Sequence, residues 1–160
     1  NLNQVWWLVA TQNPLKLDNQ KINILQRLNS AVNLKKNRII KPQALEFKIK
    51  TKFSYDTVKY LKMSMPRINF FWIMGSDNLC IMHKWYKWKK LFYLCPIIVF
   101  NRPGYFYNSL NSKAAKYFWN NKIETRKIKI TKKLPAWTFI NIRPNYISST
   151  FIRNNKIYER

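Results

Sequence analysis

The sequence is poor in glycine, cysteine, histidine and acidic residues, and each shortage excludes a class of site. Its 160 residues include 2 Gly, 2 Cys, 1 His and 6 Asp+Glu. So few glycines leave no glycine-rich phosphate loop and no GxSxG elbow around a nucleophilic serine. A single histidine excludes a multi-histidine metal site, and the few carboxylates argue against a carboxylate metal pair. If the chain is an enzyme, we therefore expect group transfer by positioning and charge stabilisation, without a nucleophilic side chain.

Long hydrophobic runs and a secretory signal are also missing. No apolar run approaches the roughly 18 residues that span a membrane. The opening stretch "NLNQVWWLVATQNP" has neither a basic segment nor a small-residue cleavage site, so it does not read as a signal peptide. Cys80 and Cys95 are not in a metal-binding spacing, and we expect them to be free thiols in a reducing cytosol. The chain is predicted to be cytoplasmic.

Positive charge, in contrast, is abundant, with 30 Lys+Arg and a formal net charge of +24. Such an excess favours binding to nucleic acid, because phosphate neutralisation contributes to affinity. It is also typical of translation from an AT-rich genome, which enriches Lys, Asn, Ile, Phe and Tyr. The lysines are scattered apart from short runs such as "KWKK" (87–90). We favour compositional drift together with a small anionic substrate over nucleic acid or an anionic membrane surface.

Strand and helix patterns alternate along the chain. Apolar runs or alternation predict strands at 5–10, 44–50, 68–75, 96–100 and 136–142. Spacings of three and four predict helices at 18–32 (capped by Asp18), 54–64 (capped by Ser54), 77–94 and 112–119, and one beginning near 148. Alternation implies parallel strands joined by helical crossovers, hence a Rossmann-like α/β fold with an open sheet and helices on both faces. We expect a single domain over residues 1–160.

Ligands of such folds bind at the carboxyl ends of the strands. "MGSDN" (74–78) follows the central strand, where Gly75 permits close approach of a ligand and Asp77 accepts hydrogen bonds from a ribose. The alternative is that Ser76 or Asp77 only caps the next helix. In "NRPGY", Arg102 stands at a strand end, suited to a phosphate or carboxylate clamp, or else simply solvated.

Aromatic residues provide a second candidate surface. "HKWYKW" (83–88) places Trp85 and Trp88 three apart. We expect Trp88 to pack in the core, whereas Trp85 is a candidate to present its ring to a flat heterocycle. His83 is read as a structural residue.

The most specific element is "YISSTFIR" near the end of the chain. Hydroxyls of Ser149 and Thr150, backbone N–H groups and the helix dipole coincide there, with Arg153 within reach. This combination predicts a phosphate site, and ordinary helix capping is the alternative reading.

These motifs together resemble those of bacterial nicotinate-nucleotide adenylyltransferases, of the nucleotidyltransferase superfamily. "VWWLVATQNPLK", "FSYDTVKYL", "FFWIMGSDNL", "HKWYKW", "PIIVFNRPGY" and "ISSTFIR" occur in the family's order over essentially the whole chain. The GxDN and ISSTxIR elements belong to the wider adenylyltransferase group, and the HKW and RPG segments point to the nicotinate enzyme. The resemblance implies adenylyl transfer from ATP to nicotinic acid mononucleotide, with Mg²⁺ accompanying ATP, giving deamido-NAD and pyrophosphate.

The resemblance also implies roles for individual residues. The residues implied to bind ATP are Lys16, Gly75, Asp77, Ser149, Thr150 and Arg153. Those implied to bind the mononucleotide are Gln12, Ser54, Trp85 and Arg102. Trp85 would stack on the nicotinate ring, and backbone near Ser54 would contact its carboxylate.

The chain departs from the family pattern at two places. Phe53-Ser54 replaces the usual Tyr-Thr, which keeps a backbone contact but removes a hydroxyl. The family's first strand and its GxFxPxHxGH loop, which binds ATP phosphates, are not in this sequence, so the catalytic residues stay unassigned. A sheet without that strand has unpaired central edges. We therefore expect the chain by itself to be inactive or poorly stable.

Two other functions remain open at this level. A basic nucleic-acid-binding protein without catalysis is one. Another adenylyltransferase of the superfamily, such as the pantetheine-phosphate enzyme, is the second, although a pantetheine chain has no use for a stacking partner such as Trp85.

Overall fold

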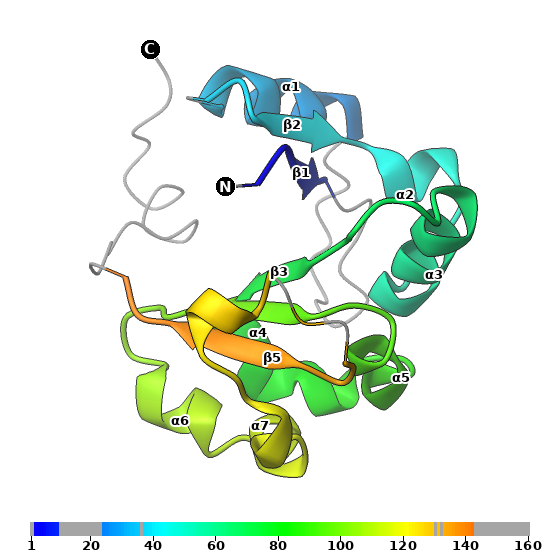
Figure 1. The fold of residues 1–160 in the computed structure, drawn as a ribbon. Coiled ribbons are helices and arrows are strands. Elements are labelled where there is room, and N and C mark those ends of the chain that lie inside the picture. The colour runs from blue at the N-terminus through cyan, green and yellow to red at the C-terminus, as the bar shows by residue number, and fades with distance from the viewer. Residues whose placement is uncertain (1, 10–23, 36, 130, 132, 143–160) are drawn as a thin grey trace. The chain divides into compact units, whose positions relative to one another are not determined.

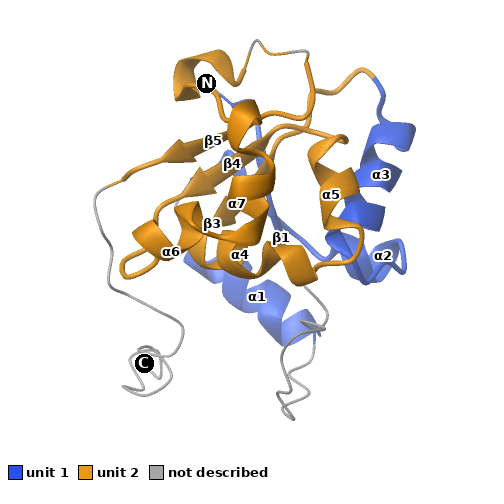
Figure 2. Ribbon diagram, turned by 90° about the horizontal axis from the view of Figure 1, so that it is seen from below, with its two compact units in different colours: residues 1–66 blue, residues 67–160 orange. Residues whose placement is uncertain are grey.

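The computed structural model describes residues 2–9, 24–35, 37–129, 131 and 133–142. Contacts divide the chain into two compact units, Asn1–Pro66 and Arg67–Arg160, which are coloured separately in Figure 2. Each unit is described by itself below. The expectation of a single domain stays a prediction.

The first unit is built on two parallel strands. Strand β1 (Val5–Leu8) pairs with β2 (Ile40–Gln43), in a register that places Val5 opposite Ile40. Helix α1 (Ile24–Leu34) lies between them in the sequence, as a parallel pair requires. Helices α2 (Leu45–Lys48) and α3 (Ser54–Ser64) complete the unit. The helix predicted at 18–32 is confirmed from Ile24 onward, and its expected cap Asp18 lies outside the described residues.

A strand was expected over 44–50, but the short helix α2 (Leu45–Lys48) lies there instead, so this prediction was wrong. The N–H groups of Lys48 and Ile49 donate to the carbonyls of Ala44 and Leu45, at 3.1 and 2.9 Å. The strand lies just before, at β2, and ends as soon as its pairing with β1 ends. Leu, Glu and Lys are good helix formers, and this preference outweighs the alternating pattern.

Helix α3 has the predicted bounds, and Val58 and Leu61 are buried as its spacing indicates. Its expected cap is different. Phe53 occupies the cap position, Ser54 is the first helical residue, and within the described chain no side chain caps this end. The hydroxyl of Thr57 instead lies 2.8 Å from that of Thr51 and fixes the approach to the helix.

The second unit is a three-stranded parallel sheet in the order β3-β4-β5 (Figure 1). The strands are β3 (Trp72–Gly75), β4 (Ile97–Phe100) and β5 (Trp137–Ile140), so the strand predicted at 68–75 forms only over its second half. The connecting elements are α4 (Ser76–Ile81), η1 (Met82–Lys84), α5 (Trp88–Phe92), α6 (Phe106–Leu110), α7 (Lys113–Tyr117), η2 (Trp119–Asn121) and η3 (Thr125–Lys127). The parallel α/β class is confirmed.

The prediction of one continuous helix over 77–94 was wrong, because helical structure stops after η1 and resumes only at α5. Lys87 has a positive φ of 50°, which interrupts helical geometry, and α5 begins only at Trp88. The predicted apolar face nevertheless holds, since Leu79, Met82 and Leu91 are all buried. The break leaves Trp85 in extended backbone (ψ 146°) between two short helices.

Different elements pack on the two faces of the second sheet. In Figure 2, helices α4, α6 and α7 lie over one face, and Ile97, Val99 and Trp137, fully buried at 0% exposure, form much of the core. Alternate residues face the other way, so Ile98 packs with Ile128 and Ala136 in a separate cluster. The indole N–H of Trp137 donates to the carbonyl of Phe118 at 2.7 Å. The two layers hold the carboxyl ends of β3 and β4 in fixed register.

Candidate nucleotide site

The carboxyl end of β3 runs directly into α4. Gly75 closes the strand and Ser76 opens the helix, so Asp77 falls in the first helical turn. Capping alone does not account for these residues, because the cap position is Gly75 and no described side chain makes a cap hydrogen bond there. Asp77 is thus available for another partner.

That partner in the structure is Arg102, which follows β4. Parallel pairing places Gly75 opposite Phe100, so the segments after both strands emerge at the same edge of the sheet. Nη1 of Arg102 lies 2.7 Å from Oδ2 of Asp77. The backbone N–H of Arg102 also donates to Oγ of the fully buried Ser76 at 2.9 Å. Asp77 and Arg102, which the resemblance assigns to ATP and to the mononucleotide, are therefore in direct contact.

The second oxygen of Asp77 is in a different situation. Oδ1 is buried and has no hydrogen-bond partner within the described part of the chain. The Asp77 side chain as a whole is 26% exposed and that of Arg102 58%. A buried carboxylate oxygen without a donor costs free energy, so Oδ1 would gain a hydrogen bond if the side chain turned toward a donor.

A side chain at position 75 would push against the side chains of Asp77 and Arg102. A Cβ atom at this position would collide with Oδ1 of Asp77 and lie 3.2 Å from Cδ of Arg102. The backbone of Gly75, with φ −80° and ψ 159°, is open to any residue. Space, and not conformation, therefore selects glycine here.

Polar side chains continue along this edge to the end of β5. The amide of Asn101 donates to Oδ1 of Asn141 at 2.9 Å, which links the residues that follow β4 and β5. Oδ1 of Asn101 is buried and finds no partner among the described residues. Asn101 is the first residue of the "NRPGY" segment, and nothing in the sequence indicated its pairing with Asn141.

Trp85 lies half-buried, and its ring meets that of Trp72 edge-on, with centroids 6.5 Å apart. The indole nitrogen of Trp72 and Nδ1 of His83 are buried and have no hydrogen-bond partner in the described chain. Trp88 instead packs against Tyr117, Phe92 and Phe118, as expected of a core residue. Trp85 is thus the tryptophan of this segment that is available for stacking.

The charge of Asp77 also acts on the neighbouring thiol. Burial, with a further contribution from the Asp77 carboxylate, raises the pKa of Cys80 above its ordinary value. Cys80 and the buried Cys95 do not form a disulfide, in agreement with the prediction. Among the described residues there is no group of three or more His, Cys, Asp and Glu that would hold a metal ion.

The structure therefore brings together Gly75, Asp77 and Arg102, and places Trp85 in the same unit. Ser54 is the first residue of α3 in the other unit, and its predicted role is not addressed by the geometry. The remaining predicted residues fall outside the described ranges: Gln12, Lys16, Ser149, Thr150 and Arg153. Ser76, which sequence reasoning treated only as a possible cap, is an additional member of this site.

Within the described ranges, no helix is long and apolar enough to cross a membrane. The family model described as cytidylyltransferase-like matches residues 1–155.

Curated relatives cover nearly all of the chain. A probable nicotinate-nucleotide adenylyltransferase of Rhizobium johnstonii is 37% identical over 155 residues, which is 96% of this chain and 78% of the relative. A probable nicotinate-nucleotide adenylyltransferase of Brucella suis is 32% identical over 154 residues, 95% of this chain and 79% of the relative.

Solved structures show a similar fold at lower identity. Plasmodium falciparum nicotinic acid mononucleotide adenylyltransferase complexed with NaAD has a TM-score of 0.62 and 21% identity. That match covers 99% of this chain and 71% of the parasite chain. The same parasite protein complexed with APC has a TM-score of 0.60, over 96% of this chain and 68% of that one.

Proposed function

The chain belongs to the nicotinate-nucleotide adenylyltransferase family of cytidylyltransferase-like proteins, and from this premise we propose that it transfers the adenylyl group of ATP to nicotinic acid mononucleotide. The products are deamido-NAD and pyrophosphate, in the biosynthesis of NAD. The observation that carries this proposal is the convergence of Gly75, Asp77 and Arg102 at one sheet edge, in a chain whose relatives bear this name over most of their length.

The nucleoside end of ATP is assigned to β3 and α4. Gly75 lets the side chains of Asp77 and Arg102 lie against its backbone, and Asp77 is the sole acidic side chain between residues 57 and 123. A carboxylate accepts hydrogen bonds from two vicinal ribose hydroxyls. The ATP phosphates are assigned to Lys16, Ser149, Thr150 and Arg153.

The mononucleotide is assigned to the residues that offer stacking and positive charge. Trp85 stacks on the nicotinate ring, and Arg102 contacts the phosphate. Gln12 and the backbone near Ser54 complete the assignment, the latter at the carboxylate of the ring. The sequence departure at Phe53 is consistent with this, because a backbone contact does not depend on the side chain.

The transfer is an in-line displacement at the α-phosphorus of ATP. A phosphate oxygen of the mononucleotide forms the new P–O bond while the bond from the α-phosphorus to the bridging oxygen of the β-phosphate breaks, and pyrophosphate leaves. Basic side chains stabilise the charge on the phosphates, and no covalent bond to the enzyme forms. Burial, and then the Asp77 carboxylate, raises the pKa of the nearby Cys80 thiol, which lowers its reactivity as a nucleophile at neutral pH.

Mg²⁺ is expected to arrive on the ATP phosphates. The described residues at the sheet edge offer a single carboxylate, Asp77, which is engaged by Arg102. This donor set does not make a protein cage for Mg²⁺, but it fits a cation that keeps its waters and binds substrate phosphates. We place the protein in the cytoplasm, where Cys80 and Cys95 stay reduced.

The test is a pyrophosphate-release assay with ATP and either nicotinic acid or nicotinamide mononucleotide, with deamido-NAD identified by mass spectrometry. In any form of the protein that turns over these substrates, Asp77→Asn and Trp85→Ala should both reduce the rate. Trp119→Ala is the matched control, since Trp119 is an exposed tryptophan on η2. Salt-sensitive binding of RNA or DNA without any binding of ATP or mononucleotide would contradict the proposal and favour a nucleic-acid-binding protein.

A further inference from the structure

Both oxygens of the Asp77 carboxylate are restricted in this structure. Oδ2 is paired with Nη1 of Arg102 at 2.7 Å, and Oδ1 is buried. A ribose that uses the Asp77 carboxylate therefore competes with Arg102 for it. The proposed function assigns this arginine to the other substrate.

Arg102 is anchored at its backbone but not at its end. Its N–H is fixed to Ser76 Oγ at 2.9 Å, while its side chain is 58% exposed and passes close to Gly75. The following Pro103-Gly104 forms a tight turn, closed by the N–H of Tyr105 on the carbonyl of Arg102 at 3.1 Å, with Gly104 at φ 79°. The guanidinium can thus exchange partners by side-chain rotation without movement of the backbone.

We propose that Arg102 couples the binding of the two substrates. Resting on the function proposed above, the ribose of ATP displaces Arg102 from Asp77, and the released guanidinium binds the phosphate of the mononucleotide. Each substrate alone must break the Asp77–Arg102 pair, whereas in the ternary complex it is broken once for both. Each substrate therefore tightens the binding of the other by the same factor, as linkage requires.

The size of the effect follows from the exposure of the pair. An ion pair with one partner more than half exposed is weak, and pairs of this kind correspond to about two- to fivefold in an equilibrium constant. This factor is the expected coupling between the substrates. It is also the expected gain in affinity for one substrate when the competing residue is removed.

Two single variants separate this inference from a structural role. Arg102→Ala keeps the backbone N–H to Ser76, so the turn stays anchored. It is expected to bind a non-hydrolysable ATP analogue about two- to fivefold more tightly and the mononucleotide more weakly. Asp77→Asn is expected to do the reverse: it should bind the ATP analogue more weakly and the mononucleotide more tightly. A merely structural role would weaken both ligands in both variants.

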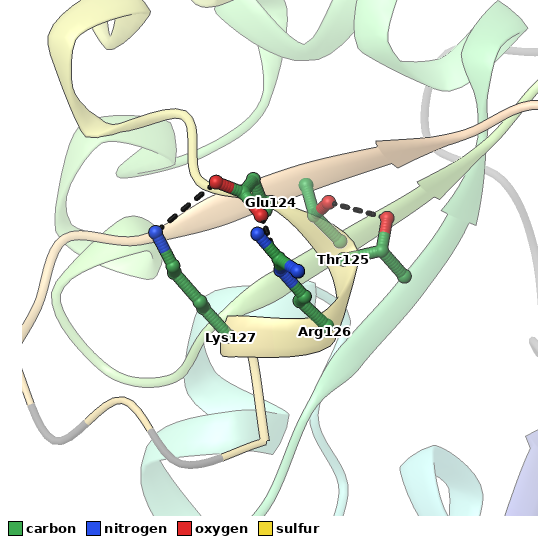
Figure 3. Close-up of polar contacts among 5 residues, drawn as sticks. Glu124, Thr125, Arg126 and Lys127 are labelled. Carbon is green, nitrogen blue, oxygen red and sulfur yellow. Dashed lines mark hydrogen bonds and ion pairs between the residues drawn. The ribbon is translucent and has the colours of Figure 1, made fainter.

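The measurement is isothermal titration calorimetry of α,β-methylene-ATP and of nicotinic acid mononucleotide, each alone and in the presence of the other. Wild type is expected to show mutual tightening, and both variants are expected to lose it. Arg126→Ala is the control, because it removes an exposed arginine from the Glu124 ion pair on η3 (Figure 3) and should match wild type. Thermal melts of every variant establish that it is folded.

The outcomes are distinguishable. Binding of both ligands by wild type without coupling, or weaker binding of both ligands by Arg102→Ala, overturns the coupling and leaves the proposed function intact. Failure of wild type to bind either ligand overturns the proposed function and this inference with it.

Discussion

The backbone N–H of Arg102 donates to Oγ of Ser76 across 2.9 Å, and this bond ties the turn after β4 to the first residue of α4. The two residues are 26 positions apart in the sequence, so the bond exists only because β3 and β4 pair in parallel with a fixed register. It positions the Arg102 side chain over Gly75 and beside Asp77.

Ser76→Ala should therefore destabilise the second unit. Ser76 is fully buried, and its removal leaves the Arg102 N–H without an acceptor, at a cost of about 1–3 kcal/mol. Ser109→Ala is the control, because Ser109 is equally buried but donates only to the carbonyl of Phe106 within α6. Its loss should be smaller. Urea denaturation measures the free energy of unfolding of both variants. Equal losses would show that the Ser76–Arg102 hydrogen bond stabilises the unit no more than the Ser109–Phe106 bond does.

Gly75→Ala should damage the site more than the fold. The backbone angles of Gly75 suit alanine, but the added Cβ displaces the Asp77 carboxylate. Hydrogen bonds to a charged group contribute about 1.5–3 kcal/mol, so we expect ATP binding to weaken about ten- to hundredfold. Calorimetry measures this loss.

Gly104→Ala is the matched control, because it should lower stability and leave ATP binding unchanged. No atom lies within 4 Å of its added Cβ, but its φ of 79° strains alanine by about 1–2 kcal/mol. We expect lower stability with ATP binding near that of wild type. If Gly75→Ala binds ATP as wild type does, the assignment of Gly75 to the ligand is wrong.

The parts of this fold that the sequence predicts well are those in which one local signal decides the structure. The apolar runs at β1, β4 and β5 and the spacing of Val58 and Leu61 on α3 were enough. At 77–94 the helical spacing of Leu79, Met82 and Leu91 is real, yet the positive φ of Lys87 breaks the helix, and no glycine or proline marks the position. At 44–50 the alternation was real but strand pairing had already ended.

The candidate site divides in the same way. The rule that ligands bind at the carboxyl ends of parallel strands places Gly75, Asp77 and Arg102 near one another from the sequence alone. The Asp77–Arg102 ion pair and the buried role of Ser76 depend on the register between β3 and β4, which one sequence does not specify. The binding of a nucleotide at this edge therefore stays a prediction from residue types. The Asp77–Arg102 ion pair adds to it, because a nucleotide that uses Asp77 has to compete with Arg102.

The Cys80 thiol should report the charge of Asp77 without any ligand. Burial first, and then the Asp77 carboxylate, raises the pKa of Cys80. Asp77→Asn removes the second cause, so the pKa of the thiol falls, more thiolate is present at a given pH, and iodoacetamide reacts faster. Arg102→Ala leaves the carboxylate unpaired and should slow the reaction. Mass spectrometry of Cys80 against pH measures the midpoints, and unchanged midpoints in both variants would exclude electrostatic contact between Asp77 and the thiol.

Glu46 and Glu124 should respond to pH with opposite signs. Burial raises the pKa of Glu46, so its stabilising contribution is present below its ordinary pKa and is lost as pH rises through the raised value. Hydrogen bonds from Lys127 and Arg126 lower the pKa of Glu124 (Figure 3), so its contribution is present at neutral pH and is lost as pH falls through the lowered value.

The two glutamine variants make this contrast measurable. At neutral pH, Glu46→Gln should raise the free energy of unfolding, because it removes the cost of a partly buried carboxylate, and the gain should vanish in acid. Glu124→Gln should lower the free energy of unfolding at neutral pH and have no effect once the wild-type carboxyl is protonated. Its effect should be small and should shrink with added salt, since the ion pairs are exposed. Urea denaturation from neutral to acid pH measures both curves. Shifts of the same sign in the two variants would contradict the opposite pKa shifts of Glu46 and Glu124.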